Sequence, residues 1–65
     1  MKNNIKQLRK AMGLTQEDLA KMVGISRQAM NAIENNRMSP NLLHAFKITI
    51  ALNQKYIEDV FIYEE

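Results

Sequence analysis

The stretch that decides the fold is LTQEDLAKMVGISRQAMNAIE, residues 14–34. Thr15 followed three residues later by Asp18 is typical of a helix N-terminus, with acidic groups at the positive end of the helix dipole. Gly24 can adopt the left-handed conformation that ends a helix. Ser26 then caps a second helical segment. The stretch therefore predicts two short helices joined by a three-residue turn.

Apolar side chains at helical spacing give both predicted helices one buried face. The inward positions are Leu19, Ala20, Val23, Met30 and Ile33, with Ile25 in the turn. Ala20 is small, as required where two crossing helices come closest. Such a pair is a helix-turn-helix unit, whose second helix projects because the first braces it. We place this unit at residues 16–35.

The flanking segments predict further helices. A helix over 4–12 begins with Asn4 as the cap and ends at Gly13, with Ile5, Leu8 and Met12 inward. The segment ENNRMSPN, residues 34–41, holds the only proline and is typical of a surface loop. A fourth helix runs from near Asn41 to Asn53. Its expected inward stripe is Leu42, Ala45, Phe46, Thr49 and Leu52, with Ile48 beside it.

The C-terminal segment predicts a short helix over 57–60. Residues 61–63 are β-prone but too few to decide between a strand and an extended tail. The fold class that follows is all-α: a compact five-helix domain. A chain of 65 residues indicates one domain over 1–65, which buries only about 60% of the surface of its unfolded chain.

Composition excludes two common ways of stabilising so small a domain. The chain has no cysteine, hence no disulfide, and one histidine cannot supply the usual ligands of a structural zinc. Self-association is the remaining means. The same composition fits a reducing compartment, and no signal peptide or long apolar span is present, so we expect a cytoplasmic protein without a membrane partner.

Charge is distributed unevenly. The net charge is +2, but residues 1–40 carry a balance of +4 and residues 41–65 a balance of −2. This asymmetry suits a polyanion on one side of the domain, although ordinary solvated charge explains it equally well.

Residues 14–34 resemble the Cro and phage-repressor family of helix-turn-helix proteins, also called the XRE family, which are bacterial and phage regulators. The resemblance extends from IKQLRKAMGLTQ through NRMSPNLLHAFKI and covers most of residues 4–61. It implies a repressor-like domain that places its recognition helix in the major groove of double-stranded DNA.

The resemblance also implies site residues. Base contacts fall to Arg27, Gln28 and Asn31, because Arg can bond guanine, and Gln or Asn can bond adenine, with two hydrogen bonds. Expected contacts with the DNA backbone are Gln16, Ser26, Asn35, Asn36, Arg37, Ser39 and Asn41. In the family, Arg9 and Glu34 occupy positions that form a partly buried ion pair, which we interpret as structural.

Two departures concern the C-terminal third. Thr49 stands where the family has a small apolar residue, and LNQKYIEDVF, residues 52–61, is one residue longer than the common pattern. Apolar residues here exceed what one small core absorbs, so residues 53–65 are expected to form a dimerisation segment. The expected interface residues are Ile50, Tyr56, Ile57, Phe61, Ile62 and Tyr63. A two-fold dimer would read a pseudo-palindromic operator with half-sites about 34 Å apart.

The function predicted from the sequence is a homodimeric transcriptional regulator, acting as a repressor by occluding its operator. The alternative is an antitoxin or adaptor that uses the same fold to bind another protein. An enzyme is not expected, because no catalytic constellation or phosphate-binding loop is present. We expect no cofactor, metal or small-molecule ligand, and interpret His44 as a surface or interface residue.

Overall fold

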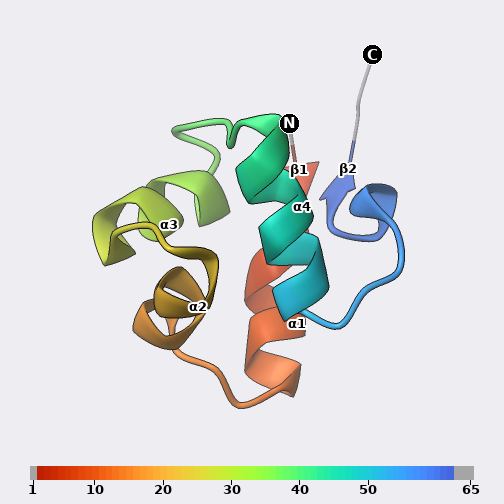
Figure 1. Ribbon diagram of the computed structural model, residues 1–65, viewed down its shortest axis with the longest axis horizontal. Coiled ribbons are helices and arrows are strands. Elements are labelled where there is room, and N and C mark those ends of the chain that lie inside the picture. Colours follow the sequence, from red (N-terminus) through yellow and green to blue (C-terminus); the bar gives the residue numbers. More distant parts are fainter. Residues whose placement is uncertain (1, 63–65) are drawn as a thin grey trace.

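The computed structural model describes residues 2–62, and within them it holds four α-helices, one 3-10 turn and a two-stranded sheet (Figure 1). The elements are β1 (Lys2–Asn3), α1 (Ile5–Ala11), α2 (Gln16–Val23), α3 (Arg27–Glu34), α4 (Leu42–Ala51), the 3-10 turn η1 (Ile57–Asp59) and β2 (Phe61–Ile62). The expectation of five helices is wrong in one element. The segment predicted as the fifth helix forms only the three-residue turn η1.

The ends of α2 are those that the sequence predicts. The Thr15 hydroxyl accepts a hydrogen bond from the Asp18 amide at 3.0 Å, and the Asp18 carboxylate accepts one from the Thr15 amide at 2.9 Å. Two amides that the helix itself leaves without a partner are thus satisfied. Gly24 ends the helix with a φ of 85°. Gly13, after α1, has a φ of 71°, so both predicted left-handed glycines are confirmed.

The start of α1 differs from the expectation. Asn4 makes no side-chain cap; the carboxamide oxygen of Asn3 instead accepts the Ile5 amide at 3.1 Å. The Asn4 amide donates to the Val60 carbonyl at 2.8 Å, so a tertiary contact fixes this residue. Met12, expected inward, lies beyond the last residue of α1 and is exposed.

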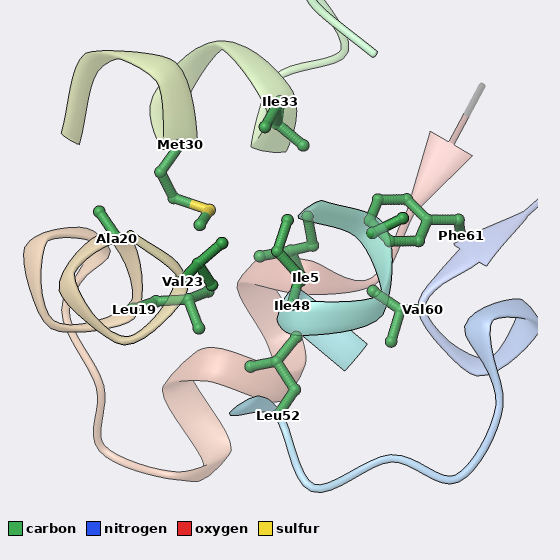
Figure 2. Close-up of a cluster of buried hydrophobic side chains, with 11 residues drawn as sticks. Ile5, Leu19, Ala20, Val23, Met30, Ile33, Ile48, Leu52, Val60 and Phe61 are labelled. Carbon is green, nitrogen blue, oxygen red and sulfur yellow. The ribbon is translucent and has the colours of Figure 1, made fainter. Parts of the chain in front are cut away.

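One apolar core joins every helix to the C-terminal segment (Figure 2). Its members are Ile5, Leu19, Ala20, Val23, Met30, Ile33, Ala45, Ile48, Leu52, Val60 and Phe61. The inward positions predicted for α2 and α3 are confirmed. In Figure 2 the side chains of α2 and α3 meet those of α4 on one side, while Val60 and Phe61 close the core on the other.

The buried face of α4 is rotated from the expected stripe. Ala45, Ile48 and Thr49 are buried, whereas Leu42 is 68% exposed and Phe46 is 49% exposed. The helix is apolar almost all round, so spacing alone does not select the face that packs. Thr49, the polar member of the buried face, donates its hydroxyl to the Ala45 carbonyl at 2.8 Å and therefore costs little to bury.

The two chain ends meet in the small sheet. β1 and β2 pair antiparallel, with Lys2 opposite Ile62 and Asn3 opposite Phe61. The choice left open for residues 61–63 is thereby settled as a strand for Phe61–Ile62, while Tyr63 lies outside the described residues.

Candidate nucleic-acid interface

The turn between α2 and α3 holds the two helices at a fixed angle. The amides of Gly24 and Ile25 both donate to the Ala20 carbonyl, at 2.8 and 3.0 Å. Ile25 packs against the core from within the turn. The Ser26 hydroxyl accepts the Ala29 amide at 3.0 Å and caps α3. The helix-turn-helix unit predicted at residues 16–35 is thus present, with α3 at the periphery of the domain (Figure 1).

The first turn of α3 carries two long polar side chains, Arg27 and Gln28. Both residues are exposed, while Met30 and Ile33 bury the opposite face of the helix. Neither Arg27 nor Gln28 makes a side-chain hydrogen bond or ion pair with another of residues 2–62. A guanidinium and a carboxamide are therefore presented to solvent with all their donors and acceptors available.

Asn31, the third expected base contact, is placed differently. Its carboxamide nitrogen donates to the Gln16 side-chain oxygen at 3.3 Å. Its carboxamide oxygen accepts a hydrogen bond from the Arg37 guanidinium. Asn31 is also less exposed than Arg27 and Gln28. One side chain thus bridges the start of α2 and the loop after α3.

The loop residues expected to contact the DNA backbone lie together after α3, and most have structural partners. The Asn35 side chain donates to the Asn31 carbonyl at 2.9 Å. Asn36 has a φ of 60°, and its carboxamide oxygen accepts from Asn3 at 3.1 Å. The Asn41 side chain caps α4 by accepting the His44 amide at 2.8 Å. Ser39 is exposed.

The structure confirms the ion pair between Arg9 and Glu34. Two hydrogen bonds join the guanidinium to the carboxylate, at 2.7 and 3.2 Å. The two side chains are 9% and 4% exposed. A third donor of Arg9 bonds the Leu14 carbonyl at 3.0 Å. Because Glu34 ends α3 and Arg9 lies on α1, this pair fixes the C-terminal end of α3 against the rest of the domain.

The cap of α2 has an electrostatic consequence. The pKa of the Asp18 carboxyl lies below its ordinary value of 3.8. The largest cause is the hydrogen bond from the Thr15 backbone amide; the Thr15 hydroxyl and the positive charge of Lys21 lower the pKa further. Since the folded pKa is lowered, Asp18 stabilises the fold above pH 3.8 and loses that contribution as the pH falls through the lowered value.

We therefore expect Asp18→Asn to lower the free energy of unfolding at neutral pH, and the difference from wild type to shrink as the pH falls below 3.8 and to vanish below the lowered pKa. Urea unfolding of both proteins at a series of pH values measures this difference in the free energy of unfolding. Glu17→Gln is the matched control, because it removes an exposed carboxylate of the same turn without touching the cap. A difference that does not depend on pH would contradict this assignment.

Asn3 is a structural residue that sequence reasoning missed. Besides capping α1, its carboxamide nitrogen lies 3.1 Å from the Ile33 carbonyl, 3.5 Å from that of Glu34 and 3.1 Å from the Asn36 side chain. Asn3 thereby ties β1 to the end of α3. No local sequence pattern predicts this role, because these hydrogen-bond partners of Asn3 lie about thirty positions away along the chain.

The described residues among those expected at a dimer interface fall into two groups, and Tyr63 lies outside the described residues. Ile50, Tyr56 and Ile62 are exposed, at 72%, 51% and 38%. Ile57 packs partly against the core, and Phe61 is buried within it, so Phe61 offers no surface to a second chain. Leu42, Leu43 and Phe46 of α4 are exposed instead. We call Leu42, Leu43, Phe46 and Ile50 the α4 outer face.

Two further findings concern the chemistry of the described residues. Residues 2–62 contain no group of three or more His, Cys, Asp or Glu side chains that could hold a metal ion. In the same residues, no helix combines the length and the apolar character needed to cross a membrane.

Comparison with known proteins agrees with this geometry. The family model described as Helix-turn-helix matches residues 5–59. An HTH-type transcriptional regulator of Methanocaldococcus jannaschii is 52% identical over 65 residues, which cover all of this chain and 97% of the relative. The HTH-type regulator YgzD of Bacillus subtilis is 48% identical, with the same coverage of both chains.

A solved structure is also similar. The crystal structure of the restriction-modification controller protein C.AhdI from Aeromonas hydrophila superposes with a TM-score of 0.80. The two chains are 30% identical, and the match covers 88% of this chain and 85% of the controller protein. With the helix-turn-helix unit and the family match, these likenesses establish that the chain belongs to the XRE-type helix-turn-helix family of transcriptional regulators, a DNA-binding family without enzymatic activity.

Proposed function

We propose that the protein binds double-stranded DNA sequence-specifically as a homodimer and regulates transcription as a repressor, by occluding its operator in the cytoplasm. The observation that carries the proposal is the pair of exposed, unengaged side chains Arg27 and Gln28 on a helix whose opposite face is buried in the core. Two further observations support it: the chain belongs to a family of non-enzymatic DNA-binding proteins, and residues 1–40 are basic.

Arg27 and Gln28 are the residues we assign to base recognition. The Arg27 fork matches the O6 and N7 acceptors of guanine, and the Gln28 carboxamide matches N7 and N6 of adenine. Each such pair discriminates against a wrong base by about 1–3 kcal/mol. These side chains begin α3, where a recognition helix reaches base edges with its N-terminal residues.

The surrounding residues suit the DNA backbone. Arg37 is exposed and has no ion pair with any acid of residues 2–62, so its charge is available to a phosphate. Gln16 and Ser26 stand at the starts of α2 and α3. We also propose that Asn35, Asn36, Ser39 and Asn41 contact the DNA backbone, because all four lie in the segment between α3 and α4 next to Arg37.

The α4 outer face is the surface we assign to the dimer. Its four large apolar side chains are between 49% and 72% exposed. Such a gathering of apolar side chains is typical of an interaction site. Tyr56 and Ile62, from the C-terminal segment, remain candidates for its margin. The same face would also suit a different protein, as the adaptor alternative requires, and the oligomeric state decides between the two.

Selection of random duplex DNA by the purified protein tests this proposal. We expect a symmetric motif with half-sites about one helical turn apart. Gln28→Ala is expected to change the preferred base at one position of each half-site. Arg37→Ala is expected to weaken all sequences alike and to lower the slope of log affinity against log salt by about one for each phosphate that the variant no longer neutralises.

The wild-type protein provides the reference in the same assay. Its affinity is expected to fall steeply with salt, because binding to phosphates releases counterions. If Gln28→Ala and Arg37→Ala both keep wild-type affinity and selectivity, the DNA-binding face is assigned wrongly. If no sequence is enriched at low salt, the adaptor function replaces the regulator.

A further inference from the structure

We infer that Asn31 is a positioning residue, which joins Gln16 and Arg37 into one phosphate-binding unit, and not a reader of bases. This inference rests on the proposed function and deepens it. It follows from the two hydrogen bonds of the Asn31 carboxamide, one to each of these residues.

The bond to Gln16 selects the orientation of the Gln16 amide. Asn31 donates through its nitrogen, so the Gln16 oxygen faces Asn31 as the acceptor, at 3.3 Å. The Gln16 NH2 group is then turned away from Asn31, with both its donors available. A phosphate oxygen can only accept hydrogen bonds, so this is the orientation in which Gln16 binds the DNA backbone.

The bond to Arg37 restrains a charged side chain without neutralising it. Arg37 donates to a neutral carboxamide oxygen, and no acid within residues 2–62 pairs with it. A carboxylate at position 31 would hold the guanidinium equally well but would oppose a phosphate nearby. A neutral acceptor lowers the entropy that Arg37 loses on binding and preserves its full charge.

The same two bonds limit what Asn31 can do at a base edge. Reading adenine takes one lone pair of the carboxamide oxygen and one N–H of its nitrogen, side by side. In Asn31 the oxygen already accepts one hydrogen bond from Arg37 and the nitrogen already donates one to Gln16, so a base could use only the second lone pair and the second N–H, in the orientation that these two bonds impose. Asn31 is also the least exposed of the three residues that the sequence assigned to base contacts. Base recognition therefore falls to Arg27 and Gln28.

A double-mutant cycle between Asn31 and Arg37 tests the inference, with fluorescence anisotropy on a selected operator and on a scrambled duplex of equal length. We expect Asn31→Ala to weaken both duplexes by the same factor, about three- to tenfold, the usual effect of removing one hydrogen bond. In the Arg37→Ala background its effect is expected to be smaller, because only the bond to Gln16 is left for Asn31→Ala to remove. Thermal unfolding of each variant confirms that the fold is intact.

Asn31→Asp separates positioning from base reading. A base reader with this substitution would shift its preference towards cytosine, whose amino group donates to a carboxylate. A positioning residue with this substitution would weaken all sequences together, by more than Asn31→Ala does, through repulsion of phosphate. Gln28→Ala is the control, since it is expected to change base preference and to act additively with Arg37→Ala.

A measurement without DNA checks the bridge itself. In NMR spectra of the free protein, Asn31→Ala is expected to shift the side-chain amide resonances of Gln16 and the guanidinium resonance of Arg37, while Gln28→Ala leaves both unchanged. A new base preference in Asn31→Asp, or full additivity of Asn31→Ala with Arg37→Ala, would overturn the inference while leaving the regulator function intact. Wild-type protein that binds no DNA would overturn both.

Discussion

Arg9→Met is expected to lower the free energy of unfolding by about 3–5 kcal/mol, because it leaves the Glu34 carboxylate buried without a counter-ion. The Glu34 side chain is only 4% exposed, so water cannot replace the two hydrogen bonds that the substitution removes. The Leu14 carbonyl loses its donor as well. A domain of this size has a total stability of about 3–10 kcal/mol, so much of the variant should be unfolded at room temperature. Urea unfolding followed by circular dichroism measures the loss.

The double variant Arg9→Met with Glu34→Leu distinguishes a buried charge from impaired packing. A buried ion pair replaced by apolar side chains of similar volume is often neutral or stabilising. The double variant is therefore expected to regain most of the stability that Arg9→Met loses. Lys10→Met, at the exposed neighbouring position, is the matched control and should change little. If the double variant is no more stable than Arg9→Met, the cost does not come from the unpaired carboxylate.

Phe46→Glu combined with Ile50→Glu is expected to dissociate the proposed dimer and to weaken operator binding by about a hundredfold or more, the gain that two linked binding sites ordinarily provide. Phe46 and Ile50 lie one turn apart on α4 and are 49% and 72% exposed. In a symmetric dimer each new carboxylate appears twice, so the substitutions bring four negative charges into one apolar interface. Sedimentation equilibrium measures the dissociation, and anisotropy with the full operator measures the affinity.

A duplex with a single half-site separates dimerisation from recognition. Affinity for it is expected to be the same in wild type and variant, since α3 is unchanged. Met12→Glu is the control, because it places the same charge at an exposed apolar position outside α4. A wild-type protein that stays monomeric even with operator present would contradict the dimer, and the α4 outer face would then be assigned to a different protein.

The two helices of the helix-turn-helix unit could be placed from the sequence because their signals are local. Thr15 and Asp18 cap α2 within three residues of each other, and Gly24 and Ser26 define the turn between the helices. Each signal acts within about one helical turn, so it needs no knowledge of the rest of the fold. The exposure of Arg27 and Gln28 follows from the same pattern.

The helix that packs across the unit shows where local reasoning fails. α4 is apolar on nearly every side, and the sequence favoured Leu42 and Phe46 as inward positions, yet both are exposed. The buried face depends on the shape of the surface that the other helices offer, which a periodicity of 3.6 residues does not contain. The α4 outer face could therefore be identified only in the folded chain.

The sequence by itself determined the helix-turn-helix unit, its caps and, through family resemblance, the Arg9–Glu34 ion pair. Only the tertiary structure decided that Asn3 joins β1 to the end of α3, that Phe61 belongs to the core, and that Asn31 bonds both Gln16 and Arg37. The physical reason is the separation of the partners along the chain. A cap forms between near neighbours, whereas these interactions join segments that only the packed core brings together.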